Sequence, residues 1–227
     1  MEIYKPIVSF NIGGLIIDIK PEAIIQLVII LFIAVLSWYF TKDLKSKPQS
    51  KKQVVVEYLY NIFQNVVDSN MGKDYRDVIP FIGTLAIFIL IMNITGLVGI
   101  APPTKNFSVT IALSLIVFVF IQAYTISKKG IKSYFVGYAK PVAPMLPINI
   151  LERVMLPISL ALRLFGNVLA ATVLVELVYK GLSSLAWIAE IGLPIPLHAY
   201  FDIFDGAIQM VIFIMLTMIN TKITVEH

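Results

Sequence analysis

The chain has 227 residues, of which 58% are hydrophobic and only 14% are charged. Soluble globular domains carry about a quarter charged side chains and under half apolar ones, so this composition excludes an ordinary soluble domain. The mean hydropathy is +0.86, and the Gly and Pro residues form no low-complexity runs. The chain is therefore neither disordered nor fibrous, and its composition indicates an integral membrane protein whose length suits about five or six spanning helices.

The residue counts also limit the chemistry. The chain has no Cys, which excludes a disulfide framework, a thiolate metal site and a Cys nucleophile. Two His cannot build a convincing zinc site, so we expect no metal and no cofactor. A net charge of +4 would suggest a nucleic-acid partner for a soluble protein. Here the cations lie beside apolar segments, where they set membrane orientation, and we expect no nucleic-acid partner.

The first half of the chain predicts an external N-terminus, a span, and a surface helix. Residues 1–20 show no signal-peptide pattern, residues 1–22 are expected outside, and residues 23–41 are expected to form the first span. The segment 42–77 begins with lysines and continues with apolar residues at helical spacing. It predicts a cytoplasmic amphipathic helix on the membrane surface, with a helix that covers a partner subunit as the alternative.

The next segments are expected to be a helical hairpin over residues 78–127, turning outside at Pro102 and Pro103, and a basic cytoplasmic loop over 128–145. Eleven cations in the two basic segments face three in the N-terminal stretch and the external turn. This asymmetry places the N-terminus outside and the C-terminus in the cytoplasm.

The last segment, residues 146–227, predicts two long helices, from Ile148 to about Tyr179 and from about Pro196 to Ile223. A connection with Gly and Pro joins them, so they are expected to form a helical hairpin. The predicted class is an all-α integral membrane protein in a single domain, with about five spans and one amphipathic surface helix. No internal repeat suggests an inverted-repeat transporter.

Arg163 interrupts the apolar stretch 154–175, which has no other charge. An Arg at membrane depth costs a few kcal/mol on insertion scales (about 2.5–3.5) and cannot be neutralised, so it needs a compensating role. Ser159, Asn167 and Ala170 share its helix face, which suits a surface against which another element slides. The alternatives are a permanent ion pair with a neighbouring helix or a side chain that reaches the membrane surface.

A second polar row lies on the last helix, where His198, Asp202, Asp205 and Gln209 recur every three or four residues. Such a row is typical of a water-filled half-pore or a proton relay. The alternatives are a helix N-terminus for the two aspartates and an interfacial loop for the histidine. Glu176 lies thirteen residues after Arg163, on another face and nearer the outer surface, so it is not the partner of Arg163.

Two motifs carry a resemblance to a known family. The string 147–152, Pro-Ile-Asn-Ile-Leu-Glu, followed by 160–167, Leu-Ala-Leu-Arg-Leu-Phe-Gly-Asn, resembles the signature of F-type ATP synthase subunit a, bacterial type. The resemblance extends through residues 93–97, 102–104 and 208–217. It implies an ion-translocating stator subunit that forms two half-channels. It also implies that the last two helices form a tilted hairpin, which packs against a rotating ring of subunit c.

The resemblance also implies roles and partners. Arg163 matches the family's essential arginine, Asn167 the polar residue one turn later, and Gln209 the glutamine that faces the arginine; Asp202 matches a position usually held by Glu or His. The implied partners are the c ring, the peripheral stalk subunit b, the rest of the synthase and membrane lipids, in a bacterial plasma membrane. Because the chain has no Walker-type loop, it is not expected to be an enzyme by itself.

One position departs from the family pattern. The family often has an acid nine residues after the arginine, where this chain has Thr172. We hypothesise that Glu176, together with Asp202 and Asp205, makes the outer half-channel acidic instead. The competing interpretation is a self-contained ion channel or secondary transporter; an intramembrane enzyme lacks a catalytic cluster. Whether the ion is H⁺ or Na⁺ stays open, because the coordinating carboxyl belongs to the partner.

Overall fold

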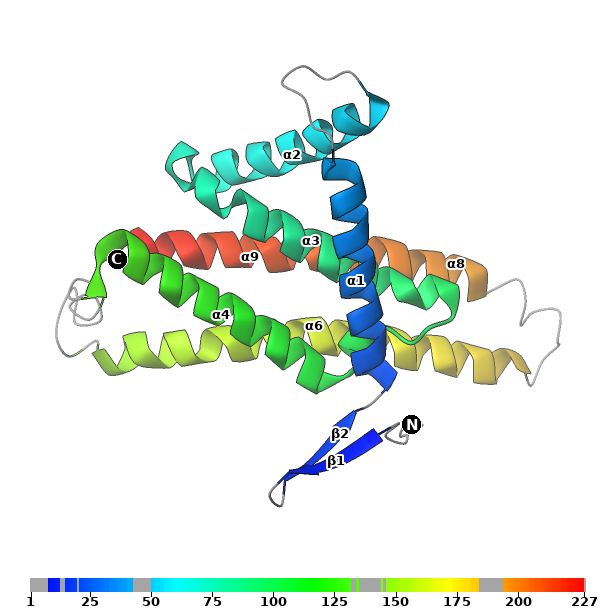
Figure 1. Cartoon of the computed structure of the whole chain (residues 1–227). Coiled ribbons are helices and arrows are strands. Elements are labelled where there is room, and N and C mark those ends of the chain that lie inside the picture. Colours follow the sequence, from blue (N-terminus) through cyan, green and yellow to red (C-terminus); the bar gives the residue numbers. More distant parts are fainter. Residues whose placement is uncertain are drawn as a thin grey trace.

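A computed structural model describes residues 8–12, 15–19, 21–42, 50–131, 134, 144, 146–183 and 194–226 (Figure 1). At the N-terminus, strands β1 (Val8–Ile12) and β2 (Leu15–Ile19) pair antiparallel, with Val8 opposite Ile19 and Ile12 opposite Leu15. The sequence analysis does not predict this hairpin, because its short period-two pattern runs directly into the long apolar stretch of the first span.

Apart from this N-terminal hairpin, the prediction of an all-α membrane protein with about five spans is confirmed. Within the described residues, five helical segments are long and apolar enough to cross a membrane. They are built from helix α1 (Pro21–Thr41), α3 (Ile79–Ile94), α4 (Phe107–Lys129), α6 (Leu146–Ser183), and the run of α8 (Pro194–His198), the π-helical η5 (Ala199–Asp205) and α9 (Gly206–Glu226). Three 3₁₀ turns connect them: η1 (Lys73–Val78), η2 (Thr95–Val98) and η3 (Pro103–Lys105).

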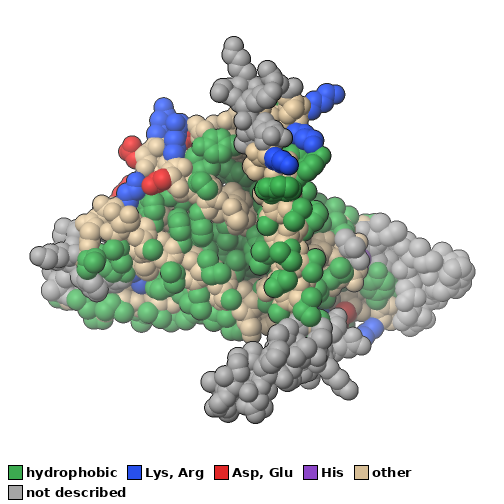
Figure 2. Space-filling view, viewed as in Figure 1, with side chains coloured by type: hydrophobic (Ala, Val, Ile, Leu, Met, Phe, Trp, Pro, Cys, Tyr) green, Lys and Arg blue, Asp and Glu red, His purple; other side chains and the backbone are tan. Residues whose placement is uncertain are grey.

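Helix α2 (Lys51–Asn70) is the predicted amphipathic helix. The Ser50 side chain caps it by accepting a hydrogen bond from the Gln53 backbone N–H at 3.2 Å. Its last turn is fixed to η1 because both oxygens of Asp68 accept hydrogen bonds from Arg76, at 3.0 and 2.6 Å. Charged side chains gather around α2, whereas hydrophobic ones cover the middle of the same face (Figure 2).

Helices α6 and α9 run antiparallel and cross the direction of α1 steeply (Figure 1). Helix α4 packs along both of them, and α3 packs along α9. If α1 spans the membrane near the normal, the α6–α9 hairpin is therefore strongly tilted, as the sequence analysis expects.

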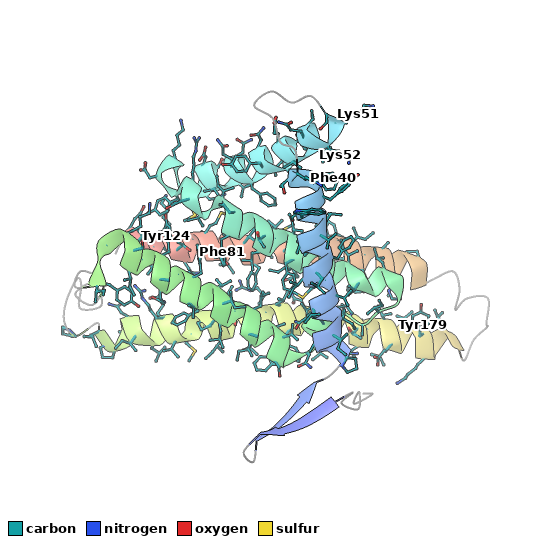
Figure 3. The ribbon with its side chains drawn as sticks, in the orientation of Figure 1. Phe40, Lys51, Lys52, Phe81, Tyr124 and Tyr179 are labelled. Atoms are coloured by element: carbon teal, nitrogen blue, oxygen red, sulfur yellow. The ribbon has the colours of Figure 1, made fainter. Side chains whose placement is uncertain are left out.

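The core lies where α3, α4 and α9 meet. Ile82 and Ile89 of α3, Ile121 of α4 and Met218 of α9 are fully buried, and Phe81 stacks on Phe120. Figure 3 shows Phe81 near Tyr124, between the ribbons of α3 and α4. Between spanning helices, close packing of this kind supplies much of the association energy, because lipid is as apolar as the side chains.

Helix α6 is buried on one side only. Leu160 and Leu164 are almost fully buried, whereas Leu162 is 52% exposed and Val173 is 45% exposed. An exposed face therefore runs along α6, and the predicted stripe lies on this helix.

Candidate functional site

Two separate cavities lie along the α6–α9 hairpin. The larger, of about 580 Å³, lies where η2 and η3 meet the helices, and the smaller, of about 210 Å³, lies towards the start of α6. We call them the outer and the inner cavity, after the predicted orientation of the chain. The outer cavity collects five predicted site residues, Glu176, His198, Asp202, Asp205 and Gln209. The inner cavity is lined by Ser159 and Arg163 of α6 together with Asn220 of α9.

Arg163 lies at the end of the inner cavity, partly buried on α6. Within the part of the chain that the structure describes, no carboxylate oxygen lies within 4.0 Å of its guanidinium group. No described group of its own chain therefore neutralises this cation. A cation inside a membrane protein normally pairs with another group, and the described residues of this chain supply no carboxylate for Arg163.

The predicted polar stripe faces away from the core. Ser159 and Ala170 are exposed, and Arg163 and Asn167 are partly exposed. Exposed apolar residues such as Leu162 and Val173 flank the stripe on the same helix. A cation on this face can therefore meet a side chain of a second protein that packs against α6.

The two cavities do not share a lining residue. On α6 the inner cavity ends at Arg163 and the outer cavity begins at Val168, about 7.5 Å further along the helix axis. Asn167 lines neither cavity. Gln209 lines the outer cavity and is 6% exposed, and no hydrogen bond joins it to Arg163 in the described structure.

A row of polar contacts crosses the outer cavity from α6 to the last helix. The Nδ1 atom of His198 lies 2.9 Å from Oδ2 of Asp202, and the Tyr179 hydroxyl lies 3.4 Å from Nε2 of His198. Figure 3 places Tyr179 towards the end of α6 that lies near α8. The sequence analysis missed Tyr179, because the length and path of the connection are needed to know which residue of α6 lies opposite His198.

Asp202 and Asp205 lie on a π-helical segment, η5. A wider π turn inside an α-helix is frequently found at functional sites. The segment continues α8 and leads into α9, so a helical turn precedes both aspartates and they are not N-terminal caps. Gly96 of η2 makes room for the acid, because a Cβ atom at Gly96 would lie 2.7 Å from Oδ1 of Asp202.

A buried bridge fixes the end of this π segment. The Nδ2 group of Asn93 donates a hydrogen bond to the Gly206 carbonyl at 3.2 Å, and the Thr104 hydroxyl donates to Oδ1 of Asn93 at 3.2 Å. Asn93 is 4% exposed and Thr104 is fully buried. The bridge therefore joins α3, η3 and the start of α9, and it sets how the two aspartates face the cavity.

Glu176 has a partner in the structure. Its Oε1 atom lies 3.5 Å from Nζ of Lys105, which belongs to η3, and both side chains line the outer cavity. Thr172 lines the same cavity, and its hydroxyl donates to the Val168 carbonyl at 2.7 Å. The structure therefore brings Glu176 to the cavity where the acid expected at Thr172 is missing.

Within the described residues, these features define a multi-pass membrane protein with a tilted helical hairpin, two cavities that share no lining residue, and an arginine without a carboxylate partner at the end of the inner cavity. The chain belongs to the ATP synthase A chain family, which it matches over residues 23–221.

Curated relatives agree with this membership. The chain is 34% identical to ATP synthase subunit a of Staphylococcus saprophyticus, with 94% of each chain covered. It is 31% identical to ATP synthase subunit a of Staphylococcus aureus strain JH9, with 100% of each chain covered. It is also 31% identical to a protein of Propionigenium modestum named ATP synthase subunit a, sodium ion specific, over 84% of this chain and 69% of the relative.

Proposed function

We propose that this chain is the ion-translocating stator subunit of a rotary F-type ATP synthase, which couples the flow of H⁺ or Na⁺ to rotation of a ring of subunit c. The observation that carries the proposal is Arg163, which has no described carboxylate partner, lies on an exposed face of α6, and is the last α6 residue that lines the inner cavity before the outer cavity begins. Family membership and the names of the relatives support it.

The mechanism requires a carboxyl group on each rotor helix to load an ion on one side and to release it on the other. Lipid disfavours the charged form of that carboxyl, whereas a nearby cation favours it. In the proposed cycle the rotor carboxyl crosses the lipid in its loaded, neutral form and gives up its ion near Arg163. The positive charge of Arg163 also repels an ion that moves directly between the cavities, because the gap has a low dielectric constant. Ion flow then requires the ring to turn.

We assign the outer path to the residues of the outer cavity: Glu176, His198, Asp202, Asp205 and Gln209. The inner path leads past Asn167 and Ser159 and through the inner cavity. The separation of the two linings on α6 supports this division.

The assembly follows from the same features. The c ring packs on the exposed stripe of α6, and subunit b of the peripheral stalk and membrane lipids contact other surfaces. The chain itself is non-catalytic, and phosphate chemistry takes place elsewhere in the complex. The basic segments around α2 and after α4 lie in the cytoplasm of a bacterial cell, with α2 on the surface of the plasma membrane. The N-terminus then lies outside and the C-terminus inside.

A self-contained channel or secondary transporter would need one path across the chain. The outer and inner cavities do not meet within the described residues, and the relatives are named as ATP synthase subunits. These observations favour the stator role over that alternative.

The proposal is tested with the whole synthase in membrane vesicles. We expect Arg163→Ala to abolish both ATP synthesis and ATP-driven ion pumping. Arg163→Lys should also lack ATP synthesis and ATP-driven ion pumping, because an ammonium is more strongly hydrated than a guanidinium and can lose its proton. Normal coupled pumping by the Arg163→Ala complex would overturn the proposal.

The outer path has its own test. Glu176→Gln and Asp202→Asn should each slow ion-driven ATP synthesis, because each removes a carboxylate from the outer cavity. Full activity in both variants would remove these two residues from the path. Synthesis driven by Na⁺ at fixed pH, compared with synthesis driven by a pH gradient without Na⁺, identifies the ion.

A further inference from the structure

Lys105 is the cation that faces Glu176 across the outer cavity. The two side chains come from different elements, η3 and α6, and their charged atoms lie 3.5 Å apart. The Lys105 side chain is 32% exposed and that of Glu176 is 54% exposed, whereas that of Asp202 is only 15% exposed. The pair therefore lies at the open side of the cavity, and the aspartate lies deeper.

The described residues of the cavity lining carry few charges. Three of them are acids, Glu176, Asp202 and Asp205, and two are lysines, Lys105 and Lys180. With neutral His198 the formal charge of these residues is −1, so neutralising one lysine makes the lining more negative and neutralising one acid removes its net charge.

The position of the pair determines its effect on an incoming cation. Clefts lined by one sign of charge concentrate ions of the opposite sign, and the effect weakens as salt is added. Loss of the positive charge at Lys105 makes the cavity more attractive to a cation, and loss of the negative charge at Glu176 makes it less attractive. The two charges act on the same ion before it reaches Asp202.

We propose that Lys105 and Glu176 form an electrostatic gate at the opening of the outer cavity, in which Lys105 sets the outer ion concentration that half-saturates transport. This proposal rests on the proposed function, and it adds a residue with a role opposite to that of the acids. Lys105 lowers the attraction of the cavity for cations, so that the path responds over a higher range of ion concentration.

The test is a double-mutant cycle in the whole synthase, reconstituted in liposomes. ATP synthesis is measured at a fixed membrane potential. The external concentration of the ion that drives the wild-type complex is varied, as external Na⁺ or as external pH. At low ionic strength, Lys105→Gln should lower the half-saturating ion concentration by about threefold to tenfold, and Glu176→Gln should raise it by about the same factor. The double variant should return to within about twofold of wild type, because its lining again carries a formal charge of −1.

Two further readouts separate an electrostatic gate from a merely structural contact. The maximal rate of Lys105→Gln should stay within about twofold of wild type, and the shifts in the half-saturating concentration should shrink as the ionic strength is raised about tenfold. Lys129→Gln, which removes a lysine from the C-terminal end of α4, is the matched control and should leave the half-saturating concentration unchanged.

Two results would overturn the gate: an unchanged half-saturating concentration in Lys105→Gln at low salt, or a double variant that behaves like Glu176→Gln alone. Inclusion of Arg163→Ala in the same series keeps the two proposals distinguishable. If Arg163→Ala is inactive and Lys105→Gln leaves the half-saturating ion concentration unchanged, the gate proposal is wrong while the stator function stands. If Arg163→Ala still couples, the stator function itself fails.

Discussion

Substitution of Gly96 by Ala tests the geometry of the outer cavity. The new Cβ atom would lie 2.7 Å from Oδ1 of Asp202, whereas ordinary contacts begin at 3.4 Å. The carboxylate must therefore withdraw by about 0.7 Å. A withdrawal of that size away from His198 lengthens the 2.9 Å contact between Asp202 and His198 to about 3.6 Å, which is too long for a hydrogen bond.

The energetic consequence is confined to the polar row. Because the clash involves the end of a flexible side chain, the fold can absorb it with a smaller penalty than the roughly 1–3 kcal/mol of an overpacked core. Loss of a hydrogen bond to a charged group costs about 1.5–3 kcal/mol, and each 1.4 kcal/mol corresponds to about tenfold in rate. We therefore expect coupled ion transport in Gly96→Ala to fall by about tenfold or more, with normal assembly of the synthase.

The assay is ATP-driven ion pumping in inverted membrane vesicles, normalised to membrane-bound ATPase activity. Gly181→Ala is the matched control, because a Cβ atom there would meet nothing within 4 Å; it should pump as wild type does. Pumping at the wild-type rate by the Gly96→Ala complex would refute the reasoning that Gly96 holds space for the Asp202 carboxylate.

Two further predictions concern stability. Asn93→Ala leaves the Gly206 carbonyl and the Thr104 hydroxyl without their buried partner. The thermal midpoint of the complex should therefore fall, by the equivalent of about 1–3 kcal/mol. An unchanged midpoint would contradict a stabilising role for these hydrogen bonds. Arg76 holds the pKa of Asp68 below its usual value of 3.8, so the pair stabilises the end of α2 above that pH and loses its effect as the pH falls through the lowered pKa. Asp68→Asn should therefore speed amide hydrogen exchange in α2 at neutral pH, and equal exchange in both proteins would count against this role.

The spans could be predicted from the sequence because each is a long apolar run with few charges, and composition alone identifies such runs. The bounds of the last helix needed more. The run from Pro194 to Glu226 contains a π-helical segment around Asp202, and helical spacing cannot reveal such a segment. Its neighbours Asn93 and Gly96 belong to α3 and η2, which are distant in sequence.

The cavity residues divide in the same way. His198, Asp202, Asp205 and Gln209 form a row on one helix, so their common cavity could be predicted from periodicity. Lys105 and Tyr179 were missed as site residues because their neighbours come from elements distant in sequence. Tyr179 meets His198 because of the register of the α6–α9 hairpin, which depends on the connection between its two helices. Lys105 meets Glu176 because η3 packs against α6.

The claim at the centre of this account is that two cavities open to opposite sides of the membrane and are separated at Arg163. Because the chain has no Cys, a single cysteine introduced into it is the only thiol of this subunit, and its labelling is read on the isolated subunit band after the assembled synthase has been treated. With a membrane-impermeant thiol reagent, Thr172→Cys should be labelled only from the outside and Ser159→Cys only from the cytoplasmic side. Labelling of both positions from the same side would contradict the separation of the two half-channels.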